Sequence, residues 1–280
     1  MYPAREQVNS MTDVPALLLQ LSDPHLFADA SRELYGVNTE ASFRTTLTRA
    51  IATAPGPLDA ILVTGDIAED RHPDTYRRFR SVMSEIGVQV ICIPGNHEDP
   101  VAMTTLLDEP PLQVCGSAGV GNWRLVMLSS HDRGKDSGWL DDGELERLER
   151  ELEAAGEQHV LVCMHHHAIP VGSPWLDAVG LANADALLSR LAEYRNVRAL
   201  LTGHVHQAFD ALHNGMRVLC TPSTCAQFTP NTHTCVMDMR PPGFRFLWLQ
   251  PSGAIQTQVV WLDELRRIER PPDSRLVEVA

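Results

Sequence analysis

The sequence predicts an α/β (α+β) fold in which a two-layer β-sandwich core is flanked by helices. Two observations predict it. Up to Thr202, short apolar runs alternate with helical patterns, and after Gln207 short strands follow one another between proline and glycine breaks. Because no linker, repeat or low-complexity stretch divides the chain, we expect one domain over residues 16–262. We expect residues 1–15 to be disordered and residues 263–280 to form a peripheral tail.

The alternating part begins with a strand that ends at the first polar motif, and capping residues delimit the later elements. Asn38 or Thr39 caps the first helix. Pro73 opens the second helix and Gly87 closes it, whereas Gly156 ends a charged helix with a leucine stripe. In chain order we predict strand 16–21, helix 39–53, strand 60–64, helix 73–86, strands 88–93 and 123–128, helix 141–155, strand 160–164, helix 182–194 and strand 197–202.

The last part of the chain contains strand patterns without helices between them. These strands are predicted over residues 216–220, 234–239, 244–249 and 255–262. Consecutive strands separated by turn residues predict an antiparallel sheet. An exposed edge of that sheet would allow a homodimer, which the sequence leaves open.

Composition excludes several classes of function. The net charge of -13, from 23 basic and 36 acidic residues, argues against nucleic acid as the partner. Bound cations would offset that charge locally, so a phosphate substrate remains compatible with it. No run of about 18 apolar residues predicts a membrane span, and residues 1–15 lack the apolar core of a signal peptide. The six cysteines form no CxxC pair, which favours buried reduced thiols in a cytoplasmic protein.

Polar clusters follow five of the predicted strands at the point where each strand ends. They are Asp23-Pro24-His25, Gly65-Asp66, Gly95-Asn96-His97-Glu98, His165-His166-His167 and Gly203-His204-Val205-His206. Ligands at the carboxyl ends of neighbouring strands converge on one place. Seven of these side chains are candidate ligands that offer oxygen or nitrogen and no sulfur, which is more than one ion needs and about right for two: Asp23, His25, Asp66, Asn96, His165, His204 and His206.

Taken singly, each motif has a structural alternative. Asp23 and His25 also fit an Asx turn beside a surface histidine, and Gly95-Asn96 fits a polar turn. His204 and His206 form the strongest single motif, because H-x-H after a strand places two imidazoles on one side. Asp66 has two carboxylate oxygens and is therefore able to bridge two cations.

The remaining polar residues of the motifs have less specific roles. His97 is free to act as a proton donor beside Asn96. In the triple histidine we select His165 as the ligand because it lies closest to the strand, and we expect His166 and His167 to be outer-sphere or to face the substrate. We expect Asp70 to support the site rather than cap a helix. The other histidines are expected to be surface or structural residues: His72, His131, His159, His213 and His233.

The ordered series D-x-H, G-D, G-N-H-E, H and G-H-x-H resembles the calcineurin-like metallophosphoesterases, and within them the bacterial class III cyclic-nucleotide phosphodiesterases. The resemblance runs from residue 18 to residue 230 and implies the metallophosphoesterase fold. Its narrower stretches are Leu34-Tyr35-Gly36-Val37-Asn38-Thr39, Pro174-Trp175-Leu176-Asp177 and Thr221-Pro222-Ser223-Thr224-Cys225-Ala226-Gln227-Phe228.

The resemblance implies two metal sites that share Asp66. One ion would be held by Asp23, His25, Asp66 and His206, and the other by Asp66, Asn96, His165 and His204. His97 matches the family histidine that approaches the scissile phosphate, and Asn96 is expected to contact the same phosphate. Two residues depart from the pattern: Glu98 stands where the family more often has aspartate, and Ser129 where many relatives have aspartate.

The implied reaction is hydrolysis of 3′,5′-cyclic AMP to 5′-AMP. A hydroxide bridging two metal ions would attack phosphorus, and His97 would protonate the departing 3′ oxygen. The mixed imidazole, carboxylate and amide set favours iron or manganese, with zinc as a further candidate. Three alternatives remain open: an enzyme for another phosphodiester or pyrophosphate, a binding module without catalysis, and a cyclic-nucleotide sensor.

Overall fold

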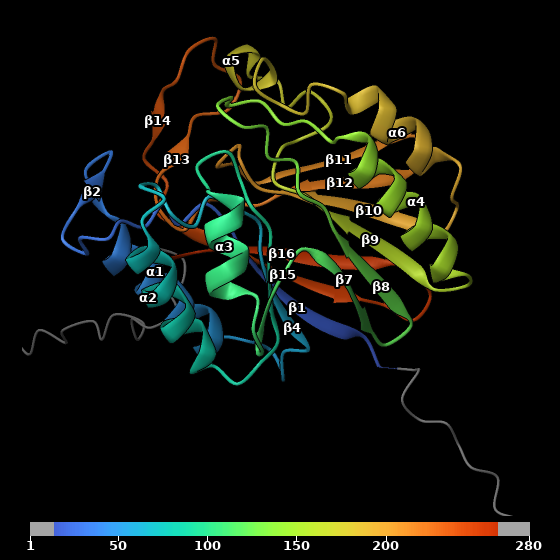
Figure 1. The fold of residues 1–280 in the computed structure, drawn as a ribbon, viewed down its shortest axis with the longest axis horizontal. Coiled ribbons are helices and arrows are strands. Elements are labelled where there is room, and N and C mark those ends of the chain that lie inside the picture. The colour runs from blue at the N-terminus through green and yellow to red at the C-terminus, as the bar shows by residue number, and fades with distance from the viewer. Residues whose placement is uncertain (1–13, 263–280) are drawn as a thin grey trace, which may run out of the picture.

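Two six-stranded sheets packed face to face form the centre of the molecule, and helices cover their outer faces (Figure 1). The computed structural model describes residues 14–262. The predicted sheet core flanked by helices is therefore confirmed. The prediction for residues 1–13 and the predicted tail of residues 263–280 lie outside the described residues.

The first sheet has the strand order β16-β15-β1-β4-β5-β6. Its strands β1, β4, β5 and β6 are parallel, whereas β15 runs antiparallel to β1 and β16 antiparallel to β15. The strands are β1 Ala16–Leu21, β4 Ala60–Val63, β5 Val90–Cys92, β6 Leu112–Val114, β15 Gly243–Leu249 and β16 Ile255–Trp261. On its outer face lie α1 Thr39–Ala52, α2 Pro73–Ser84 and α3 Pro100–Leu107.

The second sheet has the order β11-β12-β10-β9-β8-β7, with antiparallel strands only at its two edges. Its strands are β7 Gly116–Val120, β8 Trp123–Met127, β9 His159–Cys163, β10 Val197–Thr202, β11 Phe209–His213 and β12 Met216–Cys220. Helices α4 Asp142–Ala155 and α6 Ala184–Ala192 cover it. The smaller elements are β2 Glu33–Leu34, β3 Val37–Asn38, α5 Pro174–Asp177, β13 Gln227–Phe228 and β14 Met237–Asp238.

Alternation along the strands fills two different layers of the core. In β1, Leu18 packs between the two sheets, whereas Leu19 and Leu21 pack against the helices of the first sheet. This follows from the period of two, which points successive side chains to opposite faces. Since both faces are covered, these strands read as continuous apolar runs rather than as alternating patterns.

The capping signals lie where the sequence places them. The Asn38 side chain accepts a hydrogen bond from the backbone N–H of Ala41 at the start of α1. Pro73 is the first residue of α2, and Gly156 ends α4 with a φ of 53°. These residues therefore set the helix boundaries to within a few positions of the prediction.

The expectation of one antiparallel sheet at the C-terminal end is wrong. β12 joins the second sheet parallel to β10, while β15 and β16 extend the first sheet. The strand expected over residues 234–239 is reduced to Met237–Asp238. β12 and β15 thus extend different sheets, and Leu219 of β12 and Leu247 of β15 belong to the same apolar layer between those sheets.

The carboxyl ends of five parallel strands meet where the two sheets face each other. Gln20, the buried penultimate residue of β1, fixes this junction, since its Nε2 donates to Thr64 Oγ1 and to the carbonyl of Thr202, both at 3.0 Å. Thr64 follows β4 in the first sheet and Thr202 ends β10 in the second. One side chain thus holds the ends of three strands together.

No helix of residues 14–262 is long and apolar enough to cross a membrane. All six cysteines are free, and Cys92, Cys163, Cys220 and Cys225 are buried. This agrees with the expectation of buried thiols. β11 and β16 are edge strands of their sheets, so the dimer hypothesis stays a prediction.

We predict that Leu62→Ala lowers the free energy of unfolding by about 2–5 kcal/mol, because Leu62 is fully buried between the sheets. The matched control is Leu212→Ala, since Leu212 is 76% exposed and should change stability by less than about 0.5 kcal/mol. Urea denaturation of both variants measures the difference. Equal losses in the two variants would contradict the proposed packing of the sheets.

Candidate metal centre

The structure brings all seven predicted ligands into one cluster at the junction of the sheets. Those of the first sheet follow β1, β4 and β5, and those of the second follow β9 and β10. All seven side chains are buried: Asp23, His25, Asp66, Asn96, His165, His204 and His206. Residues more than 180 positions apart therefore share one small volume.

Four donor atoms form one half of the cluster. Asn96 Oδ1 lies 3.1 Å from His165 Nε2 and 3.1 Å from His204 Nδ1. His165 Nε2 lies 3.2 Å from His204 Nδ1 and 3.2 Å from Asp66 Oδ2. The four atoms thus face one another at nearly equal spacing.

The other half of the cluster shares the same oxygen of Asp66. His25 Nε2 lies 3.1 Å from His206 Nε2 and 3.9 Å from Asp66 Oδ2. His206 Nε2 lies 3.4 Å from Asp23 Oδ1. Asp66 is therefore the residue that belongs to both halves, as a bridging carboxylate must.

These spacings fit bound cations. Ligands at about 2.0–2.2 Å from a metal lie roughly 3.0–3.6 Å from one another in tetrahedral or octahedral geometry. Burial favours protonated carboxyls, yet the imidazoles of His206 and His165 outweigh it and hold the pKa values of Asp23 and Asp66 below the usual range. Both acids are consequently anionic, which is the form that binds metal.

Three of the ligand imidazoles are oriented through their second nitrogen. His165 Nδ1 lies 2.8 Å from the carbonyl of Thr64, and His206 Nδ1 lies 2.8 Å from the carbonyl of Ala226. His25 Nδ1 lies 2.8 Å from Glu69 Oε2. Each Nδ1–H donates to an oxygen, so Nε2 is the nitrogen that faces the cluster and would bind a cation once it has lost its proton. This arrangement is typical of metal-bound histidine.

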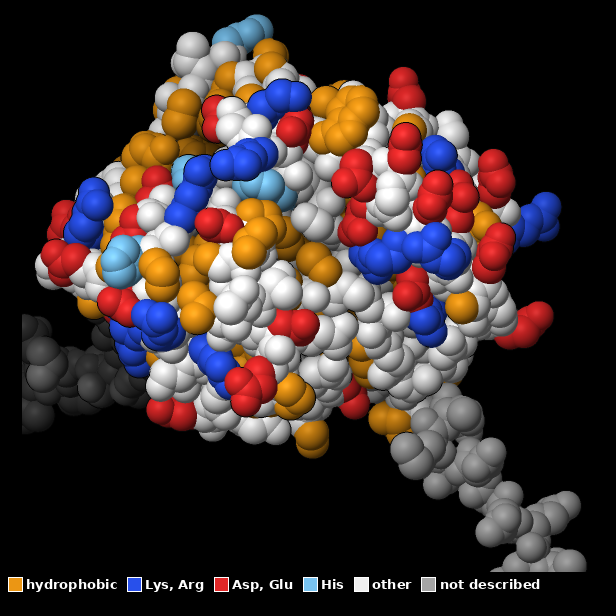
Figure 2. Space-filling model, viewed as in Figure 1, with side chains coloured by type: hydrophobic (Ala, Val, Ile, Leu, Met, Phe, Trp, Pro, Cys, Tyr) orange, Lys and Arg blue, Asp and Glu red, His pale blue; other side chains and the backbone are white. Residues whose placement is uncertain are grey.

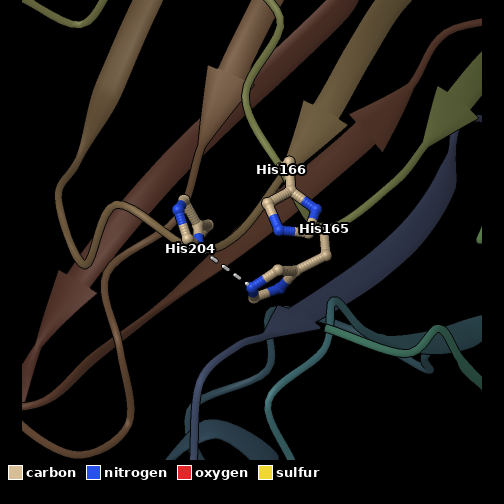
Figure 3. A group of neighbouring side chains, drawn as sticks. All are labelled: His165, His166 and His204. Atoms are coloured by element: carbon tan, nitrogen blue, oxygen red, sulfur yellow. Dashed lines mark hydrogen bonds between the residues drawn. The ribbon is translucent and has the colours of Figure 1, made fainter. Parts of the chain in front are cut away.

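His204 and its neighbours complete one side of the cluster. Figure 3 shows His165, His166 and His204, with a dashed line where His165 meets His204. Burial, followed by the nearby imidazoles of His166, His165 and His167, lowers the pKa of His204 well below its usual value. His204 is therefore neutral and able to ligate a cation.

Most of the predicted ligands also have an unusual backbone conformation. Five of the seven predicted ligands have a left-handed φ: Asp23 at 52°, His25 at 49°, Asp66 at 52°, His204 at 68° and His206 at 50°. Residues with side chains rarely adopt this conformation, which costs free energy and concentrates at functional sites. The backbone is held there by bonds between motifs, including Asp23 N to the carbonyl of Gly65 and His25 N to the carbonyl of Asp66.

Glycine is required where two motifs press together. A Cβ on Gly95 would lie 2.1 Å from Asp66 Oδ1, and a Cβ on Gly203 would lie 2.9 Å from Asp23 Oδ2. Both contacts are shorter than van der Waals packing allows. The glycines therefore let the backbone approach the two buried carboxylates.

Glu98 supports the cluster through hydrogen bonds to the backbone. Its buried carboxylate accepts hydrogen bonds from the backbone N–H groups of Asp66 at 2.8 Å, Ala68 at 2.9 Å and Gly95 at 2.6 Å. It thus ties the loop after β4 to the loop after β5. Glu98, which departs from the family pattern, therefore contacts the backbone of these loops and is not among the predicted ligands.

Glu69 is a functional residue that the sequence interpretation missed. Its Oε2 accepts from His25 Nδ1 at 2.8 Å and from His97 Nδ1 at 2.9 Å. Burial opposes its ionisation, but the hydrogen bonds from these imidazoles lower the pKa of Glu69 to about 2. The sequence offered one signal for Glu69, namely an acidic residue three positions after Asp66. The two partners of Glu69 lie on other loops, so the sequence did not show these contacts.

His97 lies at the border between the cluster and the solvent. Its backbone N–H donates to Asp66 Oδ1 at 3.0 Å, and its side chain is 35% exposed. Burial lowers the pKa of His97, but the hydrogen bond to Glu69 and the charge of Asp66 outweigh it and raise the pKa to about 9. His97 therefore carries a proton at neutral pH.

His166 and His167 lie behind His204. His166 is fully buried, with Nδ1 2.8 Å from Ser130 Oγ and Nε2 3.1 Å from the carbonyl of Asp136. The ring of His167 stacks on that of His204 at 5.7 Å. A ring nitrogen of His166 lies within 4.8 Å of ring nitrogens of His165 and His204, so the outer-sphere role expected for His166 and His167 stays a prediction.

Three other predicted side chains have structural contacts. Asp70 accepts from the N–H of Ala28 and from Thr75 Oγ1, so it joins a loop to the start of α2 and makes no contact with the cluster. His72 caps α2. His131 lies 2.8 Å through Nδ1 from the carbonyl of Gly95 and thus supports the loop after β5.

A cleft of about 340 Å³ opens over the cluster. Its polar lining includes Glu69, Asn96 and His97 beside residues of the cluster. Its apolar lining consists of Leu34, Tyr35, Trp175, Leu176, Val179 and Phe228. A ligand that fills this cleft would therefore meet both polar and apolar groups.

Known proteins are similar to this chain in sequence over most of its length. The sequence profile of the calcineurin-like phosphoesterases matches residues 16–208. The protein of Pseudomonas aeruginosa named 3′,5′-cyclic adenosine monophosphate phosphodiesterase CpdA is 38% identical over 264 residues, covering 94% of this chain and 96% of that protein. The protein of the same name from Haemophilus influenzae is 39% identical and covers 86% and 88%.

Similarity among solved structures extends to the fold. A dimetal phosphatase from Danio rerio superimposes with a TM-score of 0.61 at 15% identity, covering 89% of this chain and 99% of that chain. At this identity the likeness concerns the arrangement of the strands and helices.

We predict that Glu69→Gln lowers the pKa of His97 from about 9 towards its ordinary value, because the substitution removes the charge that stabilises the imidazolium. NMR titration of the imidazole protons in metal-free protein measures it, with the His97 resonance assigned from its loss in His97→Asn. Glu146→Gln, at an exposed glutamate, is the control. An unchanged titration in Glu69→Gln would show that Glu69 does not set the proton affinity of His97.

Proposed function

We propose that this chain, which belongs to the calcineurin-like phosphoesterase family, hydrolyses 3′,5′-cyclic AMP to 5′-AMP with two metal ions held at the cluster. The observation that carries the proposal is the place of Asp66, whose Oδ2 faces donors of both halves. The names of the relatives from P. aeruginosa and H. influenzae support the choice of substrate.

In this proposal, Asp23, His25, Asp66 and His206 hold one ion, while Asp66, Asn96, His165 and His204 hold the other. Ions of this kind, when bound, acidify water and withdraw negative charge from phosphate oxygens. The protein contributes the orientation of the ligands, which is fixed before substrate binds by the contacts to Thr64, Ala226 and Glu69.

His97 is proposed as the acid. Its Nδ1–H donates to Glu69, so Nε2 is the nitrogen left to face the substrate in the cleft. The raised pKa keeps a proton on Nε2 at neutral pH, and this proton is transferred to the 3′ oxygen as its bond to phosphorus breaks. Asn96 also lines the cleft, and in this proposal its amide N–H donates to a phosphate oxygen.

The donor set also supports a choice of metal and compartment. Carboxylate, amide and imidazole donors without thiolate suit iron or manganese, with zinc as a further candidate. Six unpaired cysteines suit a reducing compartment, for which we propose the cytoplasm. A panel containing cyclic AMP, cyclic GMP, an aryl phosphodiester and a pyrophosphate would separate the proposed substrate from other phosphodiesters and pyrophosphates.

Asp66→Ala is expected to remove both metal ions, because it deletes the oxygen shared by the two halves of the cluster. Elemental analysis after reconstitution with manganese measures the stoichiometry. Asp74→Ala is the matched control, since Asp74 is an exposed residue of α2. Retention of two equivalents by Asp66→Ala would refute the shared ligand.

His97→Ala should lower kcat for cyclic AMP by about 10²-fold or more while metal content stays near that of wild type. The wild-type rate should fall as the pH rises through the pKa of His97, since the protonated imidazole is the active form, and this alkaline limb should be absent from the variant. His233→Ala, at an exposed histidine, serves as the control. A variant with wild-type kcat would exclude His97 as the acid.

A further inference from the structure

The apolar lining of the cleft is built from three segments that are far apart in the sequence. Tyr35 comes from the turn between β2 and β3, Trp175 from α5, and Phe228 from β13. Their rings contact one another edge to face, with centroids 5.0 Å apart for Trp175 and Phe228 and 6.1 Å apart for Tyr35 and Phe228. We call these three residues the aromatic wall. Figure 2 shows hydrophobic side chains gathered at the upper left, where Figure 1 places β13, β14 and α5.

The aromatic wall contacts the cluster of predicted metal ligands. The ring of Phe228 stacks on the imidazole of His206, with centroids 4.4 Å apart and planes inclined by 17°. His206 is one of the proposed metal ligands, so the Phe228 ring of the wall lies next to the place where a phosphate would bind. A group attached to that phosphate through a sugar would meet the wall.

The wall contains one largely exposed ring and one buried donor that has no acceptor among the described residues. The Tyr35 side chain is 55% exposed although it lines the cleft. Trp175 Nε1 is buried and makes no hydrogen bond with any described residue. Buried indole N–H groups usually have an acceptor, so this donor is left unsatisfied by the described residues.

From these observations we infer that the aromatic wall binds the base of the nucleotide, with Trp175 Nε1–H donating to a ring nitrogen. Nucleobases stack on aromatic side chains and offer ring nitrogens as acceptors. A purine covers more of a wall formed by three rings than a pyrimidine does. The inference rests on the proposed function, because it places the phosphate at the metal cluster.

The test compares two ligands that differ only in the base. Binding of 5′-AMP and of ribose 5-phosphate to the manganese-loaded protein is measured by calorimetry for wild type and for variants. Trp175→Leu removes both the ring and the donor, whereas Trp175→Phe removes the donor alone. Tyr35→Leu tests the wall at an exposed position, where folding tolerates the change. Trp139→Leu is the control, because Trp139 is 47% exposed and does not line the cleft.

Wild type should bind 5′-AMP about tenfold or more tightly than ribose 5-phosphate. Trp175→Leu and Tyr35→Leu should reduce this preference severalfold, with Trp175→Phe in between and Trp139→Leu unchanged. Equal affinity of wild type for the two ligands, or a preference that survives both Trp175→Leu and Tyr35→Leu, would overturn the inference. If Trp175→Leu does not fold, Tyr35→Leu and Trp175→Phe decide the outcome.

Hydrolysis of cyclic AMP by the same preparations separates this inference from the proposed function. A protein that prefers 5′-AMP through the aromatic wall but leaves cyclic AMP intact would refute the proposed function and retain the wall as a base-binding site. A protein that hydrolyses cyclic AMP but shows no preference for the base would retain the function and refute the role of the wall.

Discussion

The buried carboxylate of Asp66 is the constraint on which the rest of the structure depends. An anion removed from water has to be matched by nearby positive or donor groups. Asp66 receives them from both sheets, because His165 of the second sheet lies 3.2 Å from its Oδ2 and the backbone N–H of His97 donates to its Oδ1. The ends of the two sheets are therefore fixed relative to each other by electrostatics as well as by the apolar residues between them.

The structure supports this constraint with strained backbone and close packing. Asp66 itself has a left-handed φ, and the loop that approaches it needs glycine at position 95. Glu98 holds both loops by accepting their N–H groups. These features cost stability locally, and the two buried core layers on either side of the first sheet offset that cost. The burial of the apolar core thus offsets the free-energy cost of the polar site.

The sequence identified the seven side chains of the cluster because each follows a buried strand, where position in the chain fixes position in space. Asp23, Asp66 and His206 were all identifiable in this way. Glu69 was not, since it follows a loop and its partners His25 and His97 come from other loops. Tyr35, Trp175 and Phe228 each lie in one of the narrower stretches of the resemblance, but the sequence did not show that they meet, because their contact depends on the arrangement of three short segments. The C-terminal strands were misassigned to one sheet because local patterns carry no information about which open edge a strand will join.

The shared hydrogen-bond acceptor has a thermodynamic consequence. One oxygen of Glu69 contacts both His25, at the metal cluster, and His97, at the cleft. A cation on His25 would draw electron density from that oxygen and so weaken the hold of His97 on its proton. By reciprocity, a proton on His97 must then weaken cation affinity by the same free energy. Cation binding to the half of the cluster that contains His25 and proton binding to His97 are linked equilibria, joined through a single oxygen atom of Glu69.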